Sequence, residues 1–231
     1  MTKALISAAL LATLAIPVQA QEEPGASEHP AQDDTKLDKM LERAEGDRAV
    51  AKPNDHDARV ALEKWAGCIA RRSNGEATRI LKMDYTQPVY TRAQKDLAKD
   101  SGTCIRDYTS LRGDGLLFAG EMAEALLESD PTPVGTALVR AASAPATTAF
   151  SFTDRVAICV VRSVPSDVAA LFATARDSAE ETAAINALAT PMGMCATAAK
   201  ARKPLSVSPA GLRAMLATAA FRSINAPGTA S

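Results

Sequence analysis

Residues 62–72 read LEKWAGCIARR, and residues 153–163 read TDRVAICVVRS. Aligned without a gap, the two stretches share an alanine, a cysteine and an arginine at the same positions. The shift of 91 residues that aligns them also pairs Cys104 with Cys195, Gly102 with Gly193, Ala119-Gly120 with Ala210-Gly211, and Ala123 with Ala214. Similarity at one fixed spacing is the sequence signature of a repeated structural unit. We therefore predict that one cysteine-bearing unit is duplicated in this chain.

The apolar residues of these stretches recur at helical spacing. Leu62, Trp65 and Ile69 step by three and four positions, which places them on one face of a helix. Trp65, the only tryptophan, is expected in the core on this face. After Asp55 the chain has few aromatic residues and much alanine, which gives little support for strands. We predict an all-α fold of two tandem repeats, each with four or five short helices and one disulfide.

Several helix starts are marked by a hydroxyl residue followed three positions later by an acidic or amide residue. Such pairs are Ser73 with Glu76, Thr91 with Gln94, and Ser178 with Glu181, and Ser208 stands before Pro209 as a further cap. Gly102 and Gly193, the latter after Pro191, are expected to interrupt a helix. The second cysteine of each unit would then lie early in a new short helix. The last helices are expected at 116–127 and 209–221.

The first twenty residues have the pattern of a secretory signal peptide. Lys3 is followed by an apolar run over 4–16 and by the small residues Val18 and Ala20. The run is shorter than the roughly 20 apolar residues of a membrane span. We expect cleavage before Gln21 and a periplasmic or secreted protein with no transmembrane span in the mature chain. An uncleaved N-terminal anchor is the alternative.

The four cysteines are all in the expected mature chain, and an even number in an oxidising compartment predicts disulfides. A unit that is copied whole most simply keeps its own bridge, which gives Cys68–Cys104 and Cys159–Cys195. Zinc sites usually take two ligands from a short C-x(2–4)-C element. The sequence has no such element, so neither a metal nor another cofactor is expected.

Composition divides the chain into six segments. Acidic residues and prolines dominate 21–54, which is expected to be a disordered linker. A short helix over 37–49 that docks on a partner is the alternative. The predicted segments are the signal peptide 1–20, the acidic linker 21–54, the first repeat 55–130, a connector 131–148, the second repeat 149–223 and a disordered tail 224–231. We expect the repeats to form one globule, with two tethered subdomains as the alternative.

Arg71 and Arg162 are the candidate functional side chains outside the cysteines, because each follows the first cysteine of its unit by three residues. Each guanidinium is expected to cap the last carbonyls of a helix or to pair with a carboxylate. A pair of anion contacts related by the duplication is the alternative. His56, Glu121 and Glu124 are expected on solvated surfaces, since no nucleophile and no matching acidic residue accompanies them.

The signal peptide, paired cysteines and alanine-rich helices together resemble uncharacterised exported α-helical proteins of sphingomonad-type alphaproteobacteria. The residues that carry the resemblance are the Cys-x-x-Arg elements at 68–71 and 159–162 and Leu111-Arg112-Gly113. The resemblance covers residues 55–223. It implies no activity, no cofactor and no catalytic residues.

Enzyme motifs are missing from the sequence, which has no G-x-S-x-G elbow, no H-E-x-x-H, no glycine-rich phosphate loop and no C-x-x-C. Export and a net charge of −1 disfavour nucleic-acid binding. We expect a non-enzymatic module that binds a protein partner or the envelope surface. The alternative is a small-molecule or anion carrier with its pocket between the repeats.

Overall fold

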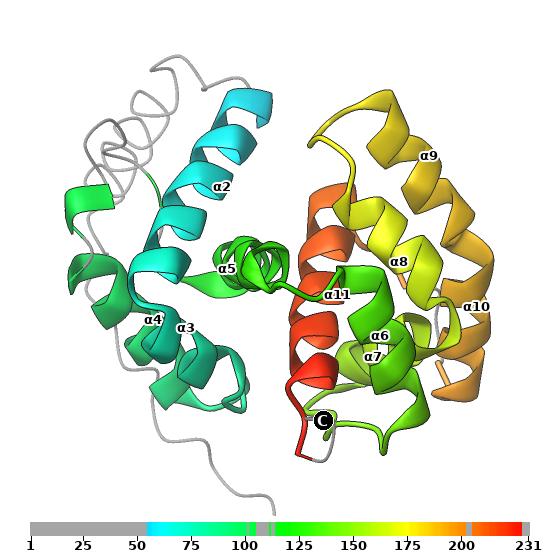
Figure 1. The fold of residues 1–231 in the computed structure, drawn as a ribbon. Coiled ribbons are helices and arrows are strands. Elements are labelled where there is room, and N and C mark those ends of the chain that lie inside the picture. Colours follow the sequence, from blue (N-terminus) through cyan, green and yellow to red (C-terminus); the bar gives the residue numbers. More distant parts are fainter. Residues whose placement is uncertain (1–54, 101, 105–110, 112–113, 202–204, 228–231) are drawn as a thin grey trace, which may run out of the picture. The chain divides into compact units, whose positions relative to one another are not determined.

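Helices form all the regular secondary structure in the part of the chain that the structure describes (Figure 1). The structure is a computed structural model, and it describes residues 55–100, 102–104, 111, 114–201 and 205–227. The all-α prediction is therefore confirmed. The predicted signal peptide, the acidic segment and residues 228–231 of the predicted tail lie outside the described residues.

The first half of the described chain begins with α2 (Asp55–Arg72). Asp55 and Asp57 stand in its first turn and arginines in its last, which complements the helix dipole. The elements that follow are α3 (Asn74–Leu81), α4 (Pro88–Asp100), the 3-10 turn η1 (Gly102–Cys104) and α5 (Gly115–Ser129).

The second half begins in the predicted connector, which contains α6 (Val134–Ser143). Its further helices are α7 (Phe152–Ser163), α8 (Pro165–Phe172), α9 (Ala179–Ala187), α10 (Ala189–Ala198) and α11 (Pro209–Ile224). All described helices belong to one compact unit, Lys52–Ser231. None of the helices in the described residues is long and apolar enough to cross a membrane.

Serine caps set two of the predicted helix starts. Ser178 Oγ accepts a hydrogen bond from Glu181 N at the start of α9, and Ser208 Oγ accepts one from Gly211 N at the start of α11. Both predictions are confirmed. The predicted cap at Ser73 is wrong: its backbone is not extended, and its hydroxyl makes no cap hydrogen bond to α3.

Two predicted helix boundaries are also wrong. Helix α4 begins at Pro88 rather than at Thr91, because proline is well suited to the first helical position. The break in the second half falls at Leu188 rather than at Gly193, which lies inside α10. Pro191 is tolerated there because the first turn of a helix needs no intrahelical N–H donor. Cys195 therefore lies in the later part of α10 rather than early in a helix.

Helix α5 is the centre of the packing, with α2 on one side and α11 on the other (Figure 1). Ile69 of α2, Met122 of α5 and Leu216 of α11 are fully buried in one core cluster. Trp65 is also buried, with its ring 5.1 Å from that of Phe118, so the prediction that it lies in the core is confirmed. The two halves thus share one apolar core.

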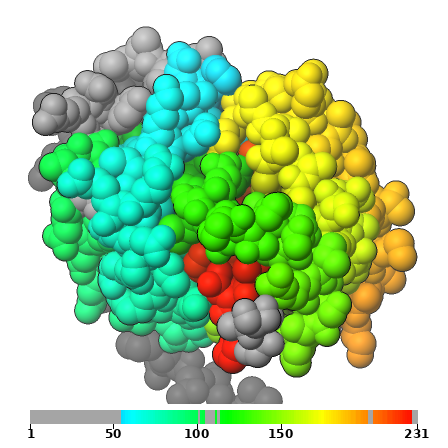
Figure 2. Space-filling model, in the orientation of Figure 1, coloured from blue at the N-terminus to red at the C-terminus, as the bar shows by residue number. Residues whose placement is uncertain are grey.

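A glycine allows α5 and α11 to approach closely. A Cβ atom placed on Gly120 would lie 2.4 Å from Ala214 Cβ and 2.5 Å from Ala214 Cα, which is nearer than real contacts allow. The halves also meet at the surface, where Figure 2 shows residues of α2 (cyan) against residues of the second half (yellow). Arg59 of α2 forms ion pairs with Asp177 and Glu181 across this contact.

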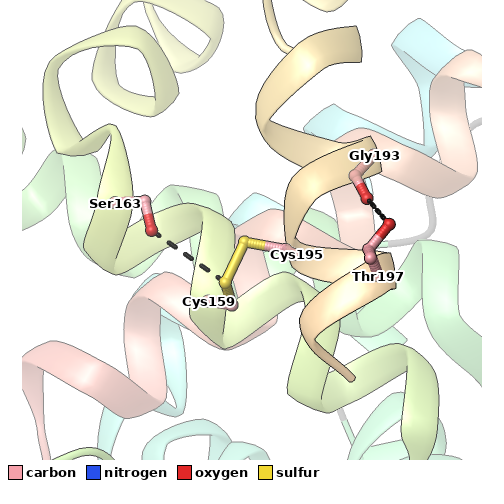
Figure 3. Close-up of a disulfide and its surroundings, with 5 residues drawn as sticks. All are labelled: Cys159, Ser163, Gly193, Cys195 and Thr197. Atoms are coloured by element: carbon pink, nitrogen blue, oxygen red, sulfur yellow. Dashed lines mark hydrogen bonds between the residues drawn. A yellow bond between two sulfur atoms is a disulfide. The ribbon is translucent and has the colours of Figure 1, made fainter. Parts of the chain in front are cut away.

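Each half contains one disulfide, and both predicted pairings are confirmed. Cys68 on α2 is bonded to Cys104 in η1, with 5.9 Å between Cα atoms. Cys159 on α7 is bonded to Cys195 on α10, with 5.7 Å between Cα atoms (Figure 3). Beside the second bridge, Thr197 Oγ1 donates to the Gly193 carbonyl at 2.9 Å (Figure 3).

Candidate functional site

A pocket of about 230 Å³ lies between residues of the two halves. The first half supplies the α3–α4 turn, α4 and the start of α5, and the second half supplies the start of α7 and the end of α11. Its wall is mostly apolar, with Leu81, Met83, Leu116 and Met215 among its residues. One hollow beside α6 is smaller, about 130 Å³, and two grooves of about 360 and 540 Å³ are larger but more open to solvent.

Gln94 organises the polar groups that the first half contributes to the pocket wall. The N-cap residue of α5, Asp114, makes no side-chain cap, and Gln94 Oε1 instead accepts from Gly115 N at 3.1 Å. Gly115 has a φ of +87°, a conformation that favours glycine. Because Gln94 Oε1 is committed as acceptor, its amide nitrogen faces Tyr90, and Nε2 donates to Tyr90 Oη at 3.2 Å.

Tyr90 therefore keeps its own proton for another partner. Its hydroxyl oxygen accepts from Gln94, and no acceptor for its O–H is found among the described residues. Tyr90 is a buried residue of the pocket wall. Burial is the main reason that the pKa of Tyr90 is raised to about 12, so the hydroxyl stays protonated at neutral pH.

A second tyrosine in the wall is already engaged. Tyr85 Oη lies 2.5 Å from Ser151 Oγ, which lies 3.0 Å from Thr153 Oγ1 and caps α7. The Tyr85 ring packs edge-on against Phe150. This hydroxyl holds the α3–α4 turn against the start of α7. Unlike the Tyr90 hydroxyl, it is not free to donate a hydrogen bond to a ligand.

Among the described residues of the pocket wall, the charged ones are Arg222 and Asp154, which form a buried ion pair. Asp154 also accepts from Phe150 N at 2.8 Å. Arg222 donates to the Thr148 carbonyl at 3.1 Å, and its guanidinium lies 4.9 Å from the centre of the Phe150 ring. Because each charge neutralises the other, the described residues of the wall carry no net charge.

The arginines singled out from the sequence lie away from this pocket. Arg162 donates to three carbonyls at the end of α6, those of Ala141, Ala142 and Ala144, at 2.8 to 2.9 Å. It thus caps a neighbouring helix rather than its own. Arg71 is exposed and lies over Gly67, its guanidinium nitrogens 3.2 and 3.4 Å from the place of a Cβ atom there. The structure does not bring the two arginines to a common site.

A buried ionic cluster between the halves is the feature that the sequence did not reveal. Glu124, expected on a solvated face, is 1 % exposed and is hydrogen-bonded to Arg213, which is 2 % exposed. Glu121 is paired with Arg176, so the prediction of two solvated carboxylates is wrong. Arg176 follows Glu121 by 55 positions and Arg213 follows Glu124 by 89, and the pattern of a single sequence contains no signal for such contacts.

The cluster continues to the surface through Glu181. Arg213 Nη1 lies 2.9 Å from Glu181 Oε1, and Arg59 holds both oxygens of the same carboxylate at 2.9 Å. Burial raises the pKa of Glu181, but hydrogen bonds from Arg59, the Asp177 N–H and Arg213 outweigh it and lower the pKa to about 2. His56 lies at the outer end, 3.2 Å from Asp177. These contacts form a network of ion pairs of the kind that stabilises a fold.

The pocket and the ionic cluster are the two candidate functional sites among the described residues. Among the described residues, no group of three His, Cys, Asp or Glu side chains has the arrangement of a metal site. The resemblance to exported sphingomonad proteins stays a prediction. Comparison of the chain with protein-family models, with curated proteins and with solved structures finds no match.

Proposed function

We propose that this protein is an exported, non-enzymatic carrier that binds a small molecule in the pocket between its two halves. The observation that carries the proposal is the pocket itself: a mostly apolar wall that includes the Tyr90 hydroxyl, whose proton has no acceptor among the described residues. Binding sites for small molecules are typically concave and mostly apolar, with few polar groups that orient the ligand.

The size of the pocket limits the ligand. A dry apolar cavity of about 150 Å³ holds benzene, whereas sites for drug-sized molecules occupy roughly 300 Å³ or more. The pocket, at about 230 Å³, lies between these sizes. A ligand of roughly eight to ten non-hydrogen atoms fits that volume.

The proposal is tested on protein purified from its own envelope fraction. Native mass spectrometry, and solvent extraction followed by mass spectrometry, should find a small molecule bound at up to one copy per chain. Thr218→Phe, which fills the pocket, should remove it. Thr136→Phe, on the exposed face of α6, is the matched control and should retain it. A bare wild-type protein would overturn the carrier proposal and favour the partner-binding role predicted from the sequence.

The proposed carrier consists of two copies of one helical unit, residues 55–130 and 149–223. Supporting this, α3 and α8 have the same length and begin 91 residues apart, at Asn74 and Pro165. Helices α5 and α11 follow the second cysteine of each half and pack on α2 and α7, respectively. A crystal structure tests the duplication: superposing α2–α5 on α7–α11 should align both disulfides.

Export is proposed from the pattern of residues 1–20 and is supported by two disulfides in the described residues, which form in oxidising compartments. N-terminal sequencing of the protein from its native host should find Gln21 as the first residue. A chain that still begins at Met1 and sediments with membranes would favour the uncleaved anchor instead.

A further inference from the structure

We infer that the ligand of the pocket is an uncharged molecule with an apolar body and one carbonyl-type oxygen, which accepts the hydrogen bond of Tyr90. This inference rests on the proposed carrier function and names the chemical class of its ligand.

The donor is fixed by the hydrogen bonds around it. Gly115 N determines which end of the Gln94 amide is oxygen, and the amide nitrogen then donates to Tyr90 Oη. A phenol has one proton, and the Tyr90 oxygen already receives one from Gln94. The remaining O–H is therefore a donor in the mostly apolar wall of the pocket, and we expect the ligand to offer it an acceptor.

The charges of the wall argue for a neutral ligand. Asp154 and Arg222 are each less than 5 % exposed and are paired with one another. An anion in the pocket would lose its hydration and meet no net positive charge, and a cation would meet no net negative charge. Transfer of an uncharged carbonyl compound has no such penalty once its oxygen is hydrogen-bonded.

Tyr85 offers a matched control within the same wall. Both tyrosines line the pocket, but the Tyr85 hydroxyl is engaged with Ser151. Replacing either residue by phenylalanine removes one oxygen atom and keeps the ring. Only Tyr90→Phe removes the donor that faces the ligand.

Three probes of equal heavy-atom number separate the possibilities: acetophenone, its hydrocarbon analogue α-methylstyrene, and benzoate. Dissociation constants are measured by NMR titration of the disulfide-bonded protein. Tyr90→Phe should raise the dissociation constant of acetophenone about two- to tenfold, as expected for the loss of one hydrogen bond. It should change the dissociation constant of α-methylstyrene by less than about twofold. Tyr85→Phe, which also alters the wall, should change the dissociation constants of acetophenone and α-methylstyrene by the same factor, because the Tyr85 hydroxyl is engaged with Ser151. Benzoate should bind wild type at least about tenfold more weakly than acetophenone.

Binding of α-methylstyrene to Tyr90→Phe shows that the variant is folded. If Tyr90→Phe and wild type bind acetophenone equally, or if benzoate binds best, the inference is wrong while the carrier function stands. If wild type binds none of the three probes, both the inference and the carrier function are overturned.

Discussion

Arg213 is a charged residue that is almost completely buried in this fold. Its side chain is 2 % exposed, yet it carries a full charge and contacts two carboxylates. Its remaining N–H groups donate to Thr174 Oγ1 and to the Phe172 and Thr174 carbonyls. A buried guanidinium is tolerated only when its donors are satisfied in this way. Removing it would leave carboxylates buried without their partner.

Arg213→Met should therefore destabilise the protein by about 3–5 kcal/mol, the range found when one partner of a buried ion pair is removed. Urea unfolding followed by circular dichroism measures the loss. Arg155→Met, on the exposed side of α7, is the control and should change the free energy of unfolding by less than about 0.5 kcal/mol. Equal losses in the two variants would contradict a special role for Arg213.

The lowered pKa of Glu181 should make the free energy of unfolding depend on pH in the acidic range. Its pKa is about 2 in the folded protein, compared with an ordinary value of 4.5. A lowered pKa stabilises the folded state above pH 4.5, and this contribution is lost as the pH falls from 4.5 towards 2. Glu181→Gln should flatten the decline of the melting temperature over that range, and Glu180→Gln should not. Glu121, whose pKa burial raises, acts in the opposite direction.

At the scale of helices, the α5–α11 contact depends on the absence of one side chain. Gly120→Ala would force the two helices apart at Ala214 and should lower the free energy of unfolding by about 1–3 kcal/mol. Gly193→Ala is the control, because a Cβ there meets no atom within 4 Å; it should raise stability by up to about 1 kcal/mol. Thermal unfolding measures the melting temperature of each variant. A similar change of melting temperature in both would contradict the close contact between α5 and α11.

Helices α9 and α10 bury few of their own side chains, so we expect the Cys159–Cys195 disulfide to hold them in place. Along α10 only Cys195 and Ala196 are buried, and along α9 only Glu181. Replacing Cys159 and Cys195 together by serine should increase amide hydrogen exchange in 179–201 at least about tenfold, with little change in α5. Mass spectrometry of exchanged peptides measures this. Uniform acceleration across the chain would show that the bridge stabilises the whole molecule instead.

Local sequence signals predicted some of the helix boundaries correctly. The caps at Ser178 and Ser208 are correct because they depend on neighbouring residues alone. The break at Gly193 is wrong because Pro191 falls in the first turn of α10, where a missing N–H does not matter. The disulfides are correct because the two cysteine pairs have equal spacing.

At the scale of the whole molecule, the sequence gives little information about contacts between the halves. Arg59 and Glu181 are 122 positions apart, and Glu124 and Arg213 are 89 apart. Helical spacing indicates which face of a helix is apolar, but not which distant helix covers it. A pocket between the repeats was the alternative prediction, but its lining residues were not predicted, since the wall combines Tyr90 with Arg222 only after the halves pack.

These long-range pairs make each half depend on the other. Produced separately, residues 55–130 and 131–227 should each lack cooperative unfolding, because the ionic cluster and the α5–α11 contact would be exposed. Mixed in equal amounts after oxidation, they should regain helical circular dichroism and co-elute in size-exclusion chromatography. Cooperative unfolding of either fragment alone would contradict this interdependence.

The placement of one disulfide in each half has a consequence for the order of biogenesis. Cys68 and Cys104 both precede Cys159 along the chain. If this chain is exported from its N-terminus, as proposed, the first pair reaches the oxidising compartment while the second is still on the other side. The first bridge can therefore close when no wrong cysteine of the same chain is present, and the second pair then emerges with only itself left to join.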